Sequence, residues 1–451
     1  MAQPTLSREL RLVDATALVV GCIIGVGIFR MAASIAGVLH TPGLVLLIWL
    51  IGGLLSLCGA LCYAELAAAY PSTGGDYVYL RQAYGPLVGF CFGWTKVFIE
   101  RTGTIAILAF VFAEYLSRVA GYDEWTRRIV ATAAVSALTA SNLLGVRWGT
   151  RVQNVLTALK LLTLGGIIMV GLAVGRGSTA NLSPLWPASA GLSTIGSLGV
   201  ALVFVLWAYG GWAESSYVAD EVRDPQRNVP RSIVGGLLLT MVLYLAVNAV
   251  YLAYVPLSEM AGQRLVAARM MSVALGPRAG DVVAVLVACS ALGALNGYIL
   301  TSARILYAAA QDHPVLSRFG RVHPRFHTPD RALLCNAAVA VVLVWTKTLD
   351  QIATYSTVAI TVFYAMACWA VIRLRRTDPD RPRPYRVWGY PWVPLLFVLT
   401  MAAFVVDLCI ERPGEALLGL GLVALGAVVY WLTLRYTTAS PTLQETNIRA
   451  E

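Results

Sequence analysis

The stretch Gly21-Cys22-Ile23-Ile24-Gly25-Val26-Gly27-Ile28-Phe29 lies inside the first long apolar segment of the chain. Each of its three glycines weakens a helix by roughly 1 kcal/mol relative to alanine. A bilayer offers no water to replace the hydrogen bonds of a broken helix, so a break persists only where its backbone faces protein or a cavity. We therefore predict an interrupted helix whose free N–H and C=O groups bind a ligand.

A second interruption is predicted at Ala208-Tyr209-Gly210-Gly211-Trp212, in a later apolar segment. Paired interruptions in corresponding positions of two halves indicate the substrate site of a membrane transporter. Trp207 and Trp212 flank this break. Next to an opened backbone, we interpret such an aromatic side chain as a gate over the site, with simple packing as the alternative.

The composition is that of an integral membrane protein. Of the 451 residues, 58% are hydrophobic and 13% are charged, and the mean hydropathy is +0.70. Soluble domains carry about 25% charged residues. We predict twelve apolar segments of spanning length. Their bounds are 12–37, 43–69, 85–117, 126–146, 152–175, 194–221, 232–254, 280–310, 332–347, 349–374, 391–410 and 414–436.

The net charge of +10 follows the predicted topology. With the N-terminus placed inside, most lysines and arginines fall in loops on the cytoplasmic side, as the positive-inside rule requires. We therefore expect a multi-pass protein of the plasma (inner) membrane with both termini cytoplasmic. The basic residues then indicate topology, and we expect no nucleic-acid partner.

The eight cysteines and four histidines predict neither a disulfide framework nor a metal site. The cysteines lie within or at the edges of apolar segments without CxxC spacing, and the histidines lie near segment ends or in one loop. A Walker lysine motif, a Ser-His-Asp set and an HExxH motif are also missing from the sequence. We expect no metal, no cofactor and no enzymatic activity.

Lys160 is the strongest candidate among the charged side chains of the apolar segments. It lies roughly 15 Å along the fifth segment from a helix start near Thr150, at 1.5 Å per residue. A lysine at that depth is costly and must face inward, toward carbonyls or hydroxyls. We predict a coupling role as a proton switch, with a structural tie to the first broken helix as the alternative.

Two acidic residues are further candidates for the pathway. Glu100 is four residues from Lys96, so the two share a helix face. They form either a bracing ion pair or a proton- or cation-handling site. Glu214 lies one helical turn past the second break. It either lines the pathway or pairs with a basic group.

Five motifs resemble the amino acid–polyamine–organocation superfamily, and within it the L-type amino acid transporters and their bacterial relatives. The resemblance covers nearly the whole chain. The motifs are GCIIGVGIF (21–29), YAELAAAYPSTGGDYVYL (63–80), WAYGGWAESSYVADEVRDPQRNVPRSI (207–233), LNGYILTSARILYA (295–308) and RPYRVWGYPWVP (383–394).

The resemblance implies an all-α membrane fold of twelve transmembrane helices, with a five-plus-five inverted repeat (LeuT-like). Helices 1 and 6 would be broken, and two further helices would follow helix 10. The implied parts are a cytoplasmic tail (1–11), a transport core (12–376), a cytoplasmic linker (377–389), helices 11 and 12 (390–437) and a second tail (438–451).

The resemblance also implies a site. In the family, N–H groups at the helix 1 break hold the substrate carboxylate, and the matching positions are Gly25, Val26 and Gly27. Carbonyls at both breaks meet the substrate amino group. The matching positions for these carbonyls are Cys22, Ile23, Trp207, Ala208 and Gly210. Trp207 takes the place of a gating phenylalanine, and Lys160 that of a built-in substitute for a sodium ion.

The function implied is secondary transport of L-amino acids, which we expect to be neutral, by alternating access. Exchange, proton symport and facilitated diffusion stay open. The alternatives are a polyamine or cationic amino acid carrier, if Glu100 or Glu214 faces the pocket, and, more remotely, an amino-acid-binding membrane sensor. The expected partners are the amino acid, the bilayer and, for symport, protons. The loop 118–125 has no cysteine, so we expect no disulfide-linked heavy chain.

Overall fold

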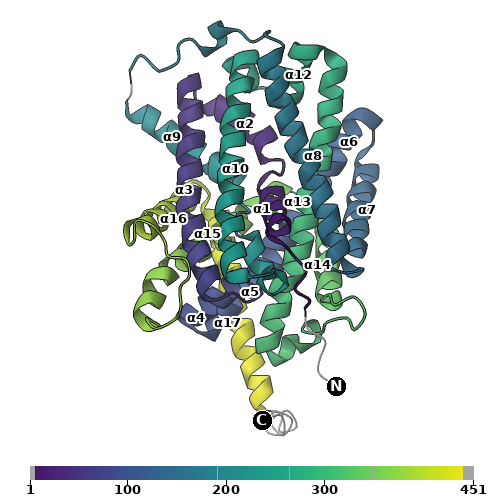
Figure 1. Ribbon diagram of the computed structural model, residues 1–451, viewed down its shortest axis with the longest axis vertical. Helices are drawn as coiled ribbons and strands as arrows, with labels where there is room; N and C mark the ends of the chain where they lie inside the picture. The colour runs from purple at the N-terminus through teal and green to yellow at the C-terminus, as the bar shows by residue number, and fades with distance from the viewer. Residues whose placement is uncertain (1–5, 190, 264, 347–348, 440–451) are drawn as a thin grey trace.

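The computed structural model describes residues 6–189, 191–263, 265–346 and 349–439, and only the backbone of 118–119, 349–356 and 435–439. The predicted tails therefore lie partly outside the described residues. Within them the chain is a bundle of helices (Figure 1). Its one extended contact there is a parallel bridge between Leu10 and Val222. The all-α prediction is confirmed for this part of the chain.

Both predicted helix breaks are present. α1 (Leu12–Ile23) ends where Ile24 leaves helical geometry, at φ −76° and ψ 70°, and α2 (Gly27–Val38) resumes after it. The second break separates α9 (Leu192–Ala208) from the 3₁₀ helix η3 (Glu214–Glu221). Gly211, inside this second break, has φ +106°, a conformation that favours glycine because it has no Cβ.

A π-helical turn interrupts the third predicted segment. α5 (Pro86–Thr95) runs into the π-helix η1 (Lys96–Arg101), which continues as α6 (Thr102–Ala120). Such turns widen a helix by one residue and are frequent at functional sites. The charges of this turn are evident in the sequence, but its π-helical geometry was not predicted.

The remaining elements complete the bundle. They are α3 (Pro42–Ala69), α4 (Asp76–Tyr84), α7 (Glu124–Leu143), α8 (Val146–Ala173), η2 (Thr179–Leu182), α10 (Pro225–Tyr254), α11 (Leu257–Met260), α12 (Val266–Leu275), α13 (Pro277–Asp312), η4 (Pro314–Phe319), α14 (Asp330–Thr346), α15 (Leu349–Thr377), α16 (Trp392–Glu411) and α17 (Pro413–Ala439).

Eight helices of the described chain are long and apolar enough to cross a membrane, counting α1 and α2 as one. Four of the twelve predicted segments do not qualify. α9 and α14 have 17 residues each, fewer than the ~20 that span a hydrocarbon core. The third segment carries the charges of η1, and α7 opens with Glu124, Arg127 and Arg128. The membrane class is supported, and twelve spans remain a prediction.

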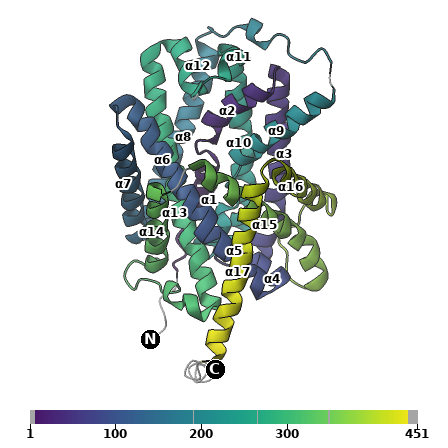
Figure 2. The ribbon, with the colours of Figure 1, turned by 180° about the vertical axis from the view of Figure 1, so that it is seen from behind.

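The broken helix lies at the centre of the bundle, where α1 packs on α8, α10 and α13 while α2 packs on α9. In its most apolar stretch, 72% of the residues are buried, against 17% in α16 and in α17. α16 packs on α3 and α15, and α17 crosses the back of the bundle along α5 and α15 (Figure 2). The two last helices are therefore peripheral, and the breaks lie inside.

Candidate functional site

The two breaks touch each other. A Cβ added to Gly27 would lie 2.9 Å from Ala208 Cα, and one added to Gly211 would lie 3.1 Å from the carbonyl carbon of Cys22. Both approaches are closer than any larger residue would allow without displacement. The glycines therefore serve two purposes, because they interrupt the helices and let the opened backbones meet.

The start of α2 presents free N–H groups in a buried position. The N–H groups of Val26, Gly27 and Ile28 make no hydrogen bond to any described residue, and all three residues are buried. Gly25 differs, since its N–H donates to Ile23 O at 2.7 Å. Helix N-termini with free N–H groups bind anions. This end of the first break can hold a carboxylate.

Carbonyls of both breaks converge on one hydroxyl from α10. Tyr244 Oη lies 2.9 Å from Ile23 O and 3.3 Å from Ala208 O. Its ring packs edge-on against Trp49, at a centroid distance of 5.4 Å, and in a tilted arrangement against Tyr209, at 5.1 Å. These carbonyls end α1 and α9, where the helix dipole is negative. Tyr244 was not anticipated, and no sequence motif marks it.

The other carbonyls of the breaks differ in whether they accept a hydrogen bond. Ser290 Oγ of α13 lies 3.2 Å from Ile24 O and 3.1 Å from Gly25 O. Trp207 O accepts the N–H of Gly210 at 3.1 Å. In the described structure no donor reaches the carbonyls of Cys22 and Gly210. The predicted amino-group ligands therefore include two free carbonyls and three engaged ones.

Lys160 reaches the first break from α8. Its side chain is buried, and Nζ donates to the carbonyl oxygen of Gly21. α8 begins at Val146, earlier than the predicted start near Thr150, so Lys160 lies about 21 Å from the helix start. The ammonium faces a carbonyl, as the cost of burying it in the membrane requires.

Two further bonds continue the contact between α8 and α1. Thr157 Oγ1 donates to Ala17 O at 2.9 Å, and Asn154 Nδ2 donates to Asp14 Oδ1 at 2.6 Å. Together with Lys160, these α8 residues are spaced by three and lie on one helix face. α8 thus holds α1 along most of its length by polar contacts.

Trp207 lies beside the contact between the breaks. A ring atom, Cζ3, would lie 3.5 Å from a Cβ on Gly27, and 43% of the residue is exposed. The tryptophan is therefore the accessible member of the predicted set. The other predicted residues of the breaks are buried, apart from the partly exposed Gly210.

A chain of alternating charges lies one turn beyond the second break. Lys96 Nζ is 3.1 Å from Glu100 Oε2, which is 3.5 Å from Arg101 Nε. Arg101 Nη2 contacts Glu214 Oε1 at 2.6 Å, and Thr301 Oγ1 donates to Glu214 Oε2 at 2.7 Å. Both candidate pathway acids are thus paired with cations in this structure. Arg101 links the two acids, a role that was not predicted.

Asp76 of α4 is a further buried acid near this chain, and it bonds to η3. It is buried, and its Oδ2 accepts the hydroxyl of Tyr217 at 2.7 Å. Burial raises the pKa of the Asp76 carboxyl, while Lys96 and the Tyr217 hydroxyl act in the opposite direction. η3 is therefore joined to α4 by the bond between Tyr217 and Asp76, and to η1 by the ion pair between Glu214 and Arg101.

A buried ladder of amides ties the neighbouring helices together. Asn142 of α7 donates to Asn296 Oδ1 at 2.9 Å, and Asn296 of α13 donates to Gln153 Oε1 at 2.9 Å. Gln153 lies one turn before Thr157 on α8. Of these residues, only Asn296 lies within one of the five motifs, LNGYILTSARILYA (295–308).

Comparison with known proteins decides the family. A family model described as amino acid permease matches residues 10–418, a range that includes both breaks, Lys160 and the charge chain. The chain belongs to the amino acid permease family. The predicted resemblance to the amino acid–polyamine–organocation superfamily is confirmed.

Three relatives illustrate the match. The b(0,+)-type amino acid transporter 1 of Mus musculus is 30% identical over 96% of this chain and 89% of its own. The large neutral amino acids transporter small subunit 2 of Homo sapiens is 31% identical over 95% and 80%. The serine/threonine exchanger SteT of Bacillus subtilis (strain 168) is 30% identical over 87% and 89%. All three are named as transporters or exchangers, which supports amino acid transport.

Proposed function

We propose that this permease is a secondary transporter that moves neutral L-amino acids across the plasma membrane by alternating access. The observation that carries the proposal is the buried set of free N–H groups at Val26, Gly27 and Ile28, directly beside converging carbonyls of two helix ends. Such a pair of sites is complementary to a carboxylate and an ammonium group on one carbon.

The proposed binding mode assigns each pole of the amino acid to one part of the breaks. The carboxylate binds the N–H groups at Gly25, Val26 and Gly27, and Gly25 must give up its bond to Ile23 O to take part. The ammonium binds carbonyls at both breaks. These carbonyls belong to Cys22, Ile23, Trp207, Ala208 and Gly210. The free carbonyls of Cys22 and Gly210 support this arrangement, and Tyr244 must share its acceptors with the ligand.

Coupling is assigned to Lys160. Its bond to Gly21 O joins α8 to the half-helix that ends at the first break, so the charge state of the ammonium acts on the position of α1. In this proposal, predicted helices 1, 2, 6 and 7 rock against helices 3–5 and 8–10, and Trp207 closes over the bound amino acid. Both exchange and proton symport are compatible with this coupling between Lys160 and α1.

A neutral substrate is favoured over a polyamine or cationic amino acid. Glu214 is held by Arg101 and Thr301, and Glu100 by Lys96 and Arg101, so the charge of each acid is already paired. The names of two relatives, a large neutral amino acids transporter subunit and a serine/threonine exchanger, support the same choice.

The proposed topology keeps twelve spans with both termini cytoplasmic. It divides the chain into the core 12–376, the linker 377–389 and two added helices in 390–437, with short tails at 1–11 and 438–451. The inverted repeat relates helices 1–5 to 6–10. We further propose that the carrier works without a disulfide-linked heavy chain, because the short connection between α6 and α7 carries no cysteine.

Counterflow in proteoliposomes tests the function. Vesicles loaded with unlabelled serine, leucine, arginine or putrescine should accumulate the labelled external compound when it is a substrate, and we expect accumulation with the neutral amino acids. A sensor would bind without accumulation. Accumulation with arginine or putrescine alone would contradict the neutral substrate. Repeating the assay with and without a pH gradient distinguishes exchange from symport.

A further inference from the structure

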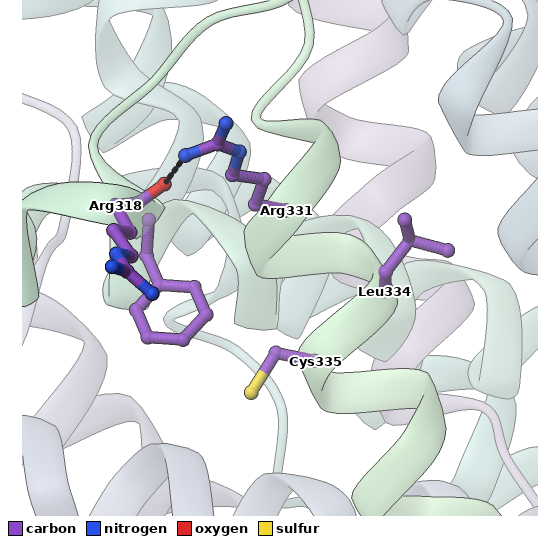
Figure 3. Close-up of a pocket in the computed structure, with 5 residues that line it drawn as sticks. Arg318, Arg331, Leu334 and Cys335 are labelled. Carbon is purple, nitrogen blue, oxygen red and sulfur yellow. Dashed lines mark hydrogen bonds between the residues drawn. The ribbon is translucent and has the colours of Figure 1, made fainter.

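A surface hollow lies far from the breaks, where α13 turns through η4 into α14. It is lined by Arg318, Phe319, Arg331, Leu334 and Cys335. Figure 3 shows Arg318 and Arg331 on facing sides, with Leu334 and Cys335 further along α14. This is the end of the molecule where α17 finishes (Figure 1). None of the residues proposed to bind substrate lines the hollow.

The hollow carries uncompensated positive charge. No carboxylate among the described residues lies within ion-pair distance of Arg318 or Arg331. The one contact between the two is a bond from Arg331 Nη1 to the carbonyl oxygen of Arg318, at 3.4 Å. A guanidinium has five N–H donors, so most donors of both arginines remain available. The segment 313–335 contains four arginines against one aspartate.

An apolar stripe begins at the hollow and follows α14. Leu334, Ala338 and Val342 come after Arg331 and are exposed at intervals of four residues, and 54% of Leu334 and 58% of Val342 are accessible. Residues four apart lie on one face of a helix. The stripe therefore leads from the charged end of α14 along the part of the helix that faces hydrocarbon in a membrane.

We propose that this hollow binds an anionic glycerophospholipid, with its phosphate between Arg318 and Arg331 and an acyl chain along Leu334, Ala338 and Val342. Two guanidiniums bind phosphate oxygens with charge-assisted bonds, and basic pockets beside membrane helices are suited to acidic headgroups. A free phosphate would use the arginines alone. The apolar stripe points to a lipid, because only a lipid uses both features.

The test compares two double variants that remove the same charge from the same segment. R318Q/R331Q alters the hollow, whereas R321Q/R325Q alters two exposed arginines that do not line it. The full chain, in detergent micelles, is titrated with phosphatidylglycerol or phosphatidylcholine, and bound lipid is counted by native mass spectrometry. We expect tight phosphatidylglycerol binding to wild type and a loss of about tenfold or more in affinity for the hollow variant alone.

Two further double variants test the apolar stripe and the charge separately. L334S/V342S should weaken binding of phosphatidylglycerol and leave binding of inorganic phosphate unchanged. R318K/R331K should retain part of the lipid binding because it keeps the charge. Equal losses in both arginine pairs, equal binding of phosphatidylcholine, or phosphate binding that matches that of the lipid would each overturn the proposal. Unchanged melting temperatures show that the variants are folded.

Discussion

The two helix breaks are stabilised in different ways. Side chains from three other helices hold the first break, through Lys160 of α8, Tyr244 of α10 and Ser290 of α13. At the second break, Tyr244 also reaches Ala208 O and the Tyr209 hydroxyl donates to Trp49 O of α3, but the turn itself is formed by backbone. Gly210 N–H bonds to Trp207 O, Glu214 N–H bonds to Gly211 O at 3.4 Å, and Gly211 supplies the positive φ.

This difference predicts two kinds of mutational effect, one on transport and one on folding. A break held by side chains can be loosened one bond at a time, and each bond can form and break as the protein moves. A break held by glycine geometry tolerates no side chain at the critical position. We therefore expect substitutions around the first break to change transport, and substitutions inside the second break to change folding.

The largest effect is expected for Lys160→Ala. It removes a charged donor from a buried carbonyl, a contact worth ~1.5–3 kcal/mol, which corresponds to a roughly 10- to 150-fold fall in transport. Initial uptake rates in proteoliposomes measure it. Arg151→Ala, an exposed cation on the same helix, is the control and should transport normally. An unchanged pH dependence in Lys160→Ala would remove the coupling role.

Gly211→Ala should damage the second break by destabilising the fold. A side chain at φ +106° costs about 1–3 kcal/mol, and its Cβ would press on Cys22. The matched change at the first break is Gly25→Ala, where a Cβ would meet Ala294 at an ordinary 3.5 Å. Thermal unfolding in detergent should show a lower melting temperature for Gly211→Ala only. Equal melting temperatures would contradict the comparison.

Tyr244→Phe removes the hydroxyl that joins the breaks. The carbonyls of Ile23 and Ala208 lose a donor, at a cost of about 1 kcal/mol, so substrate affinity should change by roughly fivefold. Tyr254→Phe is the control, because that hydroxyl, on the same helix, donates to Gly171 O at 2.9 Å and to neither break. Ligand titration monitored by melting temperature measures the substrate affinity of both variants. Equal affinities would show that the Tyr244 hydroxyl does not contribute to substrate binding.

Ser290→Ala should have the smallest effect. Ser290 shares one hydroxyl proton between two carbonyls at 3.1 and 3.2 Å, so its loss costs at most ~1 kcal/mol. A two- to fivefold decrease in transport, about that energy, is expected with no change in melting temperature. A loss as large as that of Lys160→Ala would show that the side chains at the first break act as one unit.

The sequence revealed the positions of the breaks because glycine is costly in a helix. It also identified Lys160, because an unpaired charge in an apolar segment is rare. The partners of the breaks were hidden. Tyr244 and Ser290 are ordinary residues of apolar helices, and their role depends on where α10 and α13 pack, which local pattern does not encode.

The charge chain was only half predictable for the same reason. The spacing of Lys96 and Glu100 predicted their pair, which is present. The ion pair between Arg101 and Glu214 joins residues far apart in sequence. Arg101 ends the π-helical turn η1, whose geometry was not predicted. The predicted spans at α9 and α14 stay predictions for another reason, since each of these helices has only 17 residues.

The bridge at Leu10 joins the first half of one broken helix, α1, to the second half of the other, η3. Leu10 N–H bonds to Glu221 O and Arg223 N–H bonds to Leu10 O, each at 2.8 Å. These bonds connect the residues before α1 to the end of η3. Arg304 of α13 donates two bonds to the Glu221 carboxylate, at 2.8 and 3.1 Å. The two half-helices are thereby joined, so a movement of one carries the other with it. Arg304 adds to the contacts that already hold them, which Lys160 makes with α1 and Arg101 makes with η3.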